Sequence, residues 1–130
     1  MKGFEVGKII YNNRNPKPEE ALKEFNGEYV CFDSLLAQSD FLICCCAATD
    51  ETNKIFNKSV FNKMKSNAIF VNISRGSTVD QDDLYDALFN KKIFKAGKIN
   101  HIDNKDVISY FFIIFYSFGR NNTRTVAIRP

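Results

Sequence analysis

The residues with the clearest chemical potential lie where an apolar run gives way to Asn72-Ile73-Ser74-Arg75-Gly76. Ligands of parallel α/β sheets bind beyond the carboxyl ends of the strands, and Arg75 follows such a strand-like run. An arginine there presents a planar, permanently charged fork that binds a carboxylate through paired hydrogen bonds. Without further evidence, the interpretation to prefer for Arg75 is a solvated loop residue.

Four cysteines form a second group of reactive side chains: Cys31 and the run Cys44-Cys45-Cys46. Adjacent residues of a strand point to opposite faces, so the three neighbours cannot converge on one metal ion. Their spacing is also unlike that of a disulfide framework. We interpret them as small buried hydrophobic residues in a reducing compartment and expect no metal site.

Alternating strands and helices must position these residues. Apolar runs bounded by turn residues predict strands at 6–11, 28–31, 41–47, 68–73 and 93–96. Helical spacing with proline, acidic or capping residues at the start predicts helices at 18–25, 34–38, 58–65 and 81–90. Asp80 is the expected N-cap of the last of these helices.

This alternation indicates an α/β fold with a parallel sheet and right-handed crossovers. The continuous apolar run from Phe41 to Ala47 is typical of a strand that is covered on both faces. The expected architecture is a partial, Rossmann-like doubly wound sheet. Ligand-binding residues are then expected at the carboxyl edge of that sheet.

From Met1 to about Gly97 the sequence resembles the nucleotide-binding domain of the D-isomer-specific 2-hydroxyacid dehydrogenases, and most of all their glyoxylate/hydroxypyruvate reductase branch. Several motifs in family-like order carry the resemblance: Ala37-Gln38-Ser39-Asp40-Phe41, Phe61-Asn62-Lys63-Met64-Lys65, Asn72-Ile73-Ser74-Arg75-Gly76 and Gln81-Asp82-Asp83-Leu84-Tyr85. We therefore divide the chain into a partial NAD(P)-binding domain, residues 1–97, and a divergent tail, residues 98–130.

The resemblance implies a reduction of 2-keto acids such as glyoxylate or hydroxypyruvate by hydride transfer from a nicotinamide cofactor. Arg75 occupies the place of the arginine that holds the substrate carboxylate in that family. The segment Arg14-Asn15-Pro16-Lys17 matches the one that contacts the cofactor's 2′-phosphate, so NADP is expected and NAD is the weaker alternative. Ala47 and Ile73 match further positions that touch the cofactor.

Other parts of the family pattern are absent from the sequence. It contains no Gly-x-Gly-x-x-Gly, and Met1 aligns near the end of the helix that should follow that turn, so the first strand and phosphate loop are expected to be missing. Ile99 stands where the family has an aspartate. His101, the only histidine, lies too early to match the catalytic acid. Arg75 is thus the only catalytic residue that can be assigned.

The tail after Gly97 departs from the family. It comprises a polar stretch, an apolar and aromatic run from Val107 to Phe118, and a basic segment, Arg120 to Pro130, that we expect to be irregular. One interpretation is non-homologous coding sequence. The other is structural: strand order 3-2-1-4-5-6 puts the missing strand in the middle of the sheet, and residues 107–116 have the composition to fill that slot.

Three functional hypotheses follow. The chain is a fragment of an NADPH-dependent glyoxylate/hydroxypyruvate reductase that is inactive by itself, a nucleotide- or partner-binding relative without catalysis, or a product of an incomplete gene model. The first and third are compatible with one another. Members of the family that the sequence resembles commonly form homodimers through this domain, and the oligomeric state of this chain stays open.

Composition narrows the possible partners and location. The hydrophobic share of 45% and charged share of 25% are ordinary for a globular protein. The net charge of +3 is too small and too scattered to indicate nucleic acid. The apolar run of the tail is short of the about 20 residues that a membrane-spanning helix needs. Without a signal peptide at Met1, we expect a cytoplasmic protein with no membrane partner.

Overall fold

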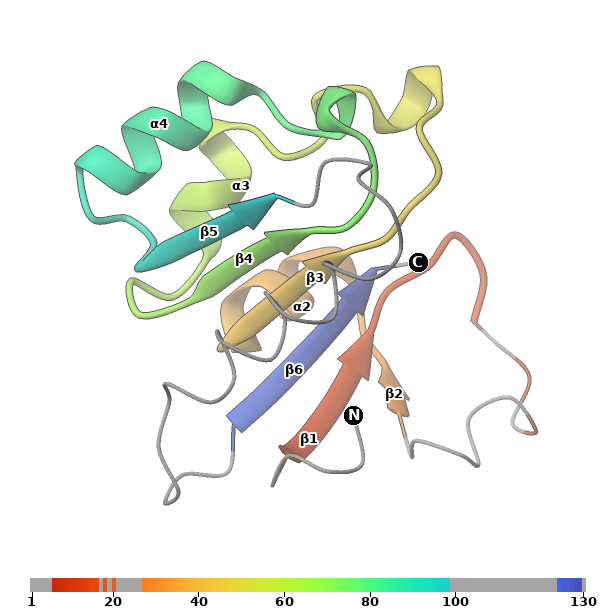
Figure 1. Ribbon diagram of the computed structural model, residues 1–130. Coiled ribbons are helices and arrows are strands. Elements are labelled where there is room, and N and C mark those ends of the chain that lie inside the picture. The colour runs from red at the N-terminus through yellow and green to blue at the C-terminus, as the bar shows by residue number, and fades with distance from the viewer. Residues whose placement is uncertain (1–5, 17, 19, 21–26, 99–123, 130) are drawn as a thin grey trace, which may run out of the picture.

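The chain forms a parallel β-sheet with helices between its strands (Figure 1). A computed structural model describes residues 6–16, 18, 20, 27–98 and 124–129. The strands of these residues are β1 (Val6–Tyr11), β2 (Gly27–Tyr29), β3 (Phe41–Cys44), β4 (Ile69–Asn72), β5 (Lys95–Lys98) and β6 (Arg124–Arg129). The α-helices are α2 (Phe32–Gln38), α3 (Lys58–Lys63) and α4 (Gln81–Phe89), and η1 (Asp50–Thr52) and η2 (Gly76–Thr78) are single 3₁₀ turns.

The strand order is β2-β1-β6-β3-β4-β5, and each neighbouring pair is parallel. This matches the expected α/β class and the doubly wound order, with β6 in the slot of the first strand. The expected elements are confirmed with shifts at their ends: β3 stops at Cys44 instead of residue 47, and β5 occupies 95–98 instead of 93–96. The helix expected at 18–25 falls mostly outside the described residues.

The central strand of the sheet comes from the tail. β6 pairs with β1, where Ala127 is the partner of Ile10, and with β3, where Ala127 is the partner of Leu42. The expectation that the segment from Arg120 to Pro130 is irregular is therefore wrong for residues 124–129. Thr125, Val126 and Ile128 are good strand formers, and pairing with β6 satisfies the backbone hydrogen-bonding groups on the facing edges of β1 and β3.

The slot was expected to receive residues 107–116, and that run lies outside the described residues. The structure places Arg124–Arg129 there instead. Some strand was needed in this position, because without one the inner edges of β1 and β3 would leave buried peptide groups without hydrogen-bond partners. The division into residues 1–97 and 98–130 stays a prediction, although β6 shares the sheet with the strands that precede it.

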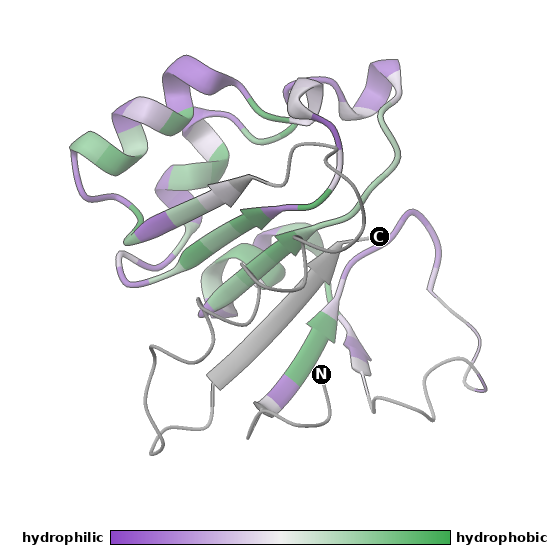
Figure 2. Cartoon of the chain, viewed as in Figure 1, coloured by the Kyte–Doolittle hydropathy of each residue, from purple (hydrophilic) through white to green (hydrophobic). Residues whose placement is uncertain are grey.

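The apolar core lies between the sheet and α2, α3 and α4. Phe70 of β4 packs against Phe56 and Phe61, with ring centroids 4.8 and 5.6 Å apart. Such aromatic pairs contribute about 0.5–1.5 kcal/mol each beyond the apolar area they bury. All residues of β3 and β4 are buried, as expected for strands covered on both faces, and Figure 2 shows these two strands as mostly hydrophobic.

Candidate substrate- and cofactor-binding edge

Four neighbouring strands end together at one edge of the sheet. In the register of the sheet, Tyr11 is the partner of Ile128, and Cys44 is the partner of both Arg129 and Asn72. Because the strands are parallel, the loops after β1, β3 and β4 all leave from this carboxyl edge (Figure 1). This is the edge where ligands of doubly wound sheets bind. It carries most of the residues that the sequence pointed to.

Arg75 lies at this edge, exposed, three residues beyond the end of β4. Its backbone is extended, with φ −92° and ψ 153°, and it immediately precedes η2. Within the part of the chain that the structure describes, no carboxylate lies within salt-bridge distance of its guanidinium. The guanidinium is therefore available for an external anion.

A buried amide fixes the loop that carries Arg75. Asn72 is 2% exposed, and its Nδ2 donates to the carbonyl of Arg75 at 3.1 Å and to Oγ1 of Thr78 at 3.3 Å. Its Oδ1 accepts from the backbone N–H and from the hydroxyl of Ser74, each at 2.9 Å. The Thr78 hydroxyl donates to the same Arg75 carbonyl at 2.7 Å. The main chain on both sides of Arg75 is thus held by buried side chains.

Cys44 extends this network under the loop. Its Sγ lies 3.4 Å from Oγ of Ser74 and 3.5 Å from Sγ of Cys46. Both thiols are buried, as expected for packed core residues, and Cys45 is partly buried. The same expectation is wrong for Cys31, which is exposed. The hydrogen bond between Sγ of Cys31 and Oγ of Ser34, 3.2 Å long, lowers the pKa of the Cys31 thiol. Among the described residues no group of side chains could hold a metal ion.

The loop after β1 reaches toward the loop after β3. Arg14 is exposed, and its guanidinium forms an ion pair with the carboxylate of Glu51 in η1. Asn12, which is buried, donates from Nδ2 to the carbonyl of Val30 at 2.9 Å and anchors the start of this loop. Asn15 and Pro16 are exposed beside Arg14, and Lys17 lies outside the described residues.

The loop after β3 presents small side chains on a fixed backbone. Ala47 and Ala48 are exposed. The hydroxyl of Thr52 donates to the carbonyl of Ala47 at 2.7 Å and accepts from the N–H of Thr49 at 2.8 Å, so η1 begins in a reciprocal capping arrangement. Ile73, 41% exposed, follows the neighbouring strand β4. A flat ligand could approach this surface closely because no large side chain rises from Ala47 or Ala48.

These residues fit a dinucleotide only in part. The exposed cation Arg14 suits a phosphate at one end, while Ala47, Ile73 and Arg75 suit a nicotinamide and a carboxylate at the other. Between them stands β6, whereas a doubly wound sheet normally supplies there a glycine-rich turn and a helix N-terminus for the pyrophosphate. The sequence contains no such glycine motif. The described residues therefore do not fit the pyrophosphate.

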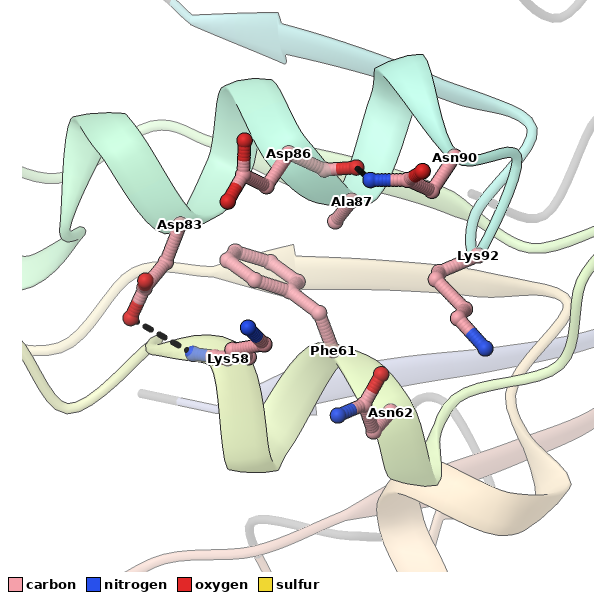
Figure 3. A pocket seen from close by; sticks show the side chains of 8 residues that line it. All are labelled: Lys58, Phe61, Asn62, Asp83, Asp86, Ala87, Asn90 and Lys92. Atoms are coloured by element: carbon pink, nitrogen blue, oxygen red, sulfur yellow. Dashed lines mark hydrogen bonds between the residues drawn. The ribbon is translucent and has the colours of Figure 1, made fainter.

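A separate groove of about 50 Å³ lies between α3 and α4, and none of the predicted site residues lines it (Figure 3). Phe61 and Ala87 form its apolar floor. Its rim is polar, and Oδ2 of Asp83 accepts a hydrogen bond from the backbone N–H of Lys58 at 2.8 Å. This hydrogen bond joins the two helices. We therefore interpret the groove as a gap left where α3 packs against α4.

The sequence missed Asn72, Ser74 and Thr78 as residues of the site, although Asn72 and Ser74 belong to a motif that the resemblance used. A polar Asn72 at the end of a fully apolar strand was the available signal, because buried amides require hydrogen-bond partners. Glu51 was also missed. Its pairing with Arg14 depends on the spatial approach of two loops 37 positions apart.

Comparison with known proteins identifies the family. Residues 1–98 match the model of the D-isomer specific 2-hydroxyacid dehydrogenase NAD binding domain. The chain belongs to this family. The resemblance to this family, and its expected extent over about residues 1–97, are confirmed. None of the helices in the described part of the chain is long and apolar enough to span a bilayer.

Similar 2-hydroxyacid dehydrogenases include two kinds of reductase. The chain is 50% identical over 97 residues to human glyoxylate reductase/hydroxypyruvate reductase. These aligned residues make up 75% of this chain and 29% of the human protein. The chain is 45% identical over 95 residues to glyoxylate/hydroxypyruvate reductase B of Escherichia coli O17:K52:H18, covering 73% of this chain and 29% of that protein. The chain thus spans less than a third of the length of these relatives.

Solved structures of the family share the fold. A glyoxylate reductase from Paecilomyes thermophila superposes with a TM-score of 0.67 at 30% identity, covering 93% of this chain and 34% of that one. The holo form of Rhodotorula graminis D-mandelate dehydrogenase gives a TM-score of 0.69 at 24% identity, covering 93% and 33%. The second likeness concerns the fold alone.

Proposed function

We propose that this chain is part of an NADPH-dependent glyoxylate/hydroxypyruvate reductase, and that the chain by itself does not catalyse the reduction. The observation that carries the proposal is the exposed Arg75 at the carboxyl edge, on a loop fixed by Asn72, with a guanidinium that makes no salt bridge to any described residue. A guanidinium so placed matches the planar, charged carboxylate of a 2-keto acid. The family and the names of its similar members support the same substrate class.

The proposed absence of catalysis has two physical reasons. Hydride transfer to a keto group needs a proton donor for the developing alkoxide, and the described residues place no histidine near Arg75. The partial fit to a dinucleotide also leaves the pyrophosphate without its usual backbone donors. We expect weak NADPH binding that depends on Arg14, and no measurable reduction of glyoxylate.

Carboxylate binding is the direct test of the proposed substrate class. Oxalate is titrated into isotopically labelled protein while the side-chain N–H signals of arginine are followed by nuclear magnetic resonance. We expect the Arg75 side-chain signal and the backbone amide signals of Ser74 and Gly76 to shift, and the two amide shifts to vanish in Arg75→Lys, because an ammonium cannot form the paired hydrogen bonds. Lys63→Gln, on the surface of α3, is the matched control. A response that survives in Arg75→Lys contradicts the proposal.

Cofactor preference is tested separately by the fluorescence of NADPH and NADH with the purified chain. Arg14→Gln should reduce NADPH binding about tenfold and leave NADH binding unchanged, since only NADPH carries the 2′-phosphate. Equal affinity of the wild-type protein for both cofactors would contradict the NADP assignment. Turnover of glyoxylate by the chain alone would contradict the proposed absence of catalysis.

A non-catalytic, nucleotide- or partner-binding relative of the same superfamily is the second candidate. It is favoured by the large aromatic side chains that are exposed on α4, away from the carboxyl edge. Failure of oxalate to perturb Arg75 would favour this candidate over the first. By analogy with the family we also propose a homodimer and a cytoplasmic location.

A further inference from the structure

The ion pair between Arg14 and Glu51 involves the cation that the proposed function assigns to the 2′-phosphate of the cofactor. Arg14 follows β1, and Glu51 lies in η1, which follows β3. Because β6 separates these two strands, their loops leave the sheet from positions about 10 Å apart, and the ion pair joins the two loops. Within the described residues, Arg14 forms no salt bridge with any other carboxylate.

Local hydrogen bonds hold the main chain on both sides of this ion pair. The backbone N–H of Arg14 donates to Oδ1 of Asn13 at 2.8 Å. Beside Glu51, the hydroxyl of Thr52 accepts from the backbone N–H of Thr49 at 2.8 Å and caps the start of η1. The carboxylate of Glu51 is therefore presented to Arg14 from a fixed turn before any ligand binds.

The paired guanidinium and carboxylate have no net charge, and this affects the two cofactors differently. A phosphate monoester such as the 2′-phosphate of NADPH carries about two negative charges near pH 7. The Glu51 carboxylate repels that phosphate and already occupies a donor, Nη2, of the Arg14 guanidinium. The 2′-hydroxyl of NADH carries no charge and is repelled by neither group. Glu51 thus opposes the binding of NADPH and has much less effect on NADH.

We propose that Glu51 is a specificity-determining residue, whose carboxylate competes with the 2′-phosphate of NADPH for Arg14 and so reduces the preference for NADPH over NADH. The inference rests on the proposed function and deepens it, because it concerns the cofactor selectivity of the same edge. The side chains of Arg14 and Glu51 are 74% and 72% exposed, so water weakens their attraction. A phosphate can therefore displace Glu51, and the competition lowers the affinity for NADPH without abolishing it.

Removal of the Glu51 charge tests the competition. Measured by cofactor fluorescence, Glu51→Gln should bind NADPH about threefold more tightly than the wild-type chain and should bind NADH equally well. The same gain is expected for adenosine 2′,5′-bisphosphate and not for adenosine 5′-monophosphate, because only the first carries a 2′-phosphate. In an Arg14→Gln background, Glu51→Gln should lose most of this gain, since the group for which the two anions compete is absent.

Asp50→Asn is the matched control, because it removes the same charge from the adjacent residue of η1, and Asp50 forms no salt bridge with any described residue. It should leave the ratio of the two cofactor affinities nearly unchanged, and thermal unfolding checks that each variant is folded. An equal gain for Asp50→Asn, a full gain in the Arg14→Gln background, or weaker NADPH binding by Glu51→Gln would overturn the proposal.

The Arg14 variant separates failure of this inference from failure of the proposed function. If Arg14→Gln weakens NADPH binding while Glu51→Gln does not strengthen it, the inference fails and the NADP assignment stands. If Arg14→Gln leaves NADPH binding unchanged, the NADP assignment and the inference fail together. Oxalate binding at Arg75 is independent of both outcomes and continues to test the proposed substrate class.

Discussion

At the scale of single residues, the site depends on how Arg75 is held. Its guanidinium is exposed, yet its main chain is bonded to the buried side chains of Asn72 and Thr78. This arrangement favours ligand binding by the guanidinium, because a backbone that is already fixed loses less conformational entropy when the ligand binds. The sequence could place Arg75 after a strand. It could not show that η2 brings the Thr78 hydroxyl within hydrogen-bond distance of both the Asn72 side-chain amide and the Arg75 carbonyl.

Asn72→Ala should therefore loosen the Arg75 loop and lower the free energy of unfolding by about 1–3 kcal/mol, since buried polar groups lose their partners. Amide hydrogen exchange should quicken at Ser74 and Thr78 more than in α4. The comparison of loop with helix separates a local effect from a general loss of stability. Equal acceleration of exchange in the loop and in α4 would show that Asn72 stabilises the whole fold and not the Arg75 loop in particular.

Asp80 is a second residue with a measurable role. It caps α4 by accepting from the N–H groups of Asp82 and Asp83, and it forms an ion pair with Lys54 at 3.0 Å. The hydrogen bond from Lys54 lowers the pKa of the Asp80 carboxyl, and the same bond raises the pKa of the Lys54 ammonium. The stabilising contribution of Asp80 is complete above its ordinary pKa of about 3.9 and is lost as the pH falls through the lower, folded value.

Urea unfolding between pH 2.5 and pH 6 checks this linkage. The wild-type protein should lose more stability on acidification below about pH 4 than Asp80→Asn, whose side chain does not titrate. Lys54→Met should reduce the same pH dependence, because it removes the largest cause of the lowered pKa. If the unfolding free energies of wild-type and Asp80→Asn fall in parallel with pH, the charge of the Asp80 carboxyl does not stabilise the folded state.

At the scale of elements, helix ends were easier to predict than the central strand. Asp80 was recognised as an N-cap because the capping signal is local, and the structure confirms it. β6 was missed because Arg124–Arg129 is short and follows a much more apolar run. Its place depends on pairing with Ile10 and Leu42, which are more than 80 positions away in the sequence. Local patterns carry no information about such pairing.

A non-glycine residue in the left-handed conformation follows the C-terminal end of α4. Lys91 has φ 54°, in the left-handed region that favours glycine. The N–H of Lys91 donates to the carbonyl of Leu88 and that of Lys92 to the carbonyl of Ala87, which is the hydrogen-bond pattern of a Schellman C-cap.

Lys91→Gly should stabilise the protein by about 0.5–1 kcal/mol, because glycine adopts this backbone conformation without the steric cost of a Cβ. Urea unfolding measures the change. Lys92→Gly is the control with the same loss of charge, and it should not stabilise the fold. A gain for both variants would assign the effect to charge instead of backbone conformation.

At the scale of the whole molecule, β6 joins two parts of the sheet that would otherwise be separate: β1 with β2, and β3 with β4 and β5. Ala127 has strand partners on both sides, so a proline there removes a hydrogen bond of a central strand and its ring clashes with a neighbour.

Ala127→Pro should abolish cooperative thermal unfolding and increase the binding of a hydrophobic dye, whereas removal of Pro130 should leave both unchanged. Circular dichroism and dye fluorescence measure the two effects. Cooperative unfolding in the Ala127→Pro variant would show that the sheet tolerates an incomplete centre and would contradict the role assigned to β6.

Of the strands that the structure describes, the one translated last lies in the middle of the sheet. A nascent chain therefore carries the edges of β1 and β3 without their common neighbour until residues 124–129 have been translated. Long-range pairing of this kind slows folding, and exposed strand edges attract other chains during the delay. Formation of the sheet thus has to wait for the synthesis of β6, and we expect the yield of this protein in cells to depend on chaperones that shield the incomplete sheet.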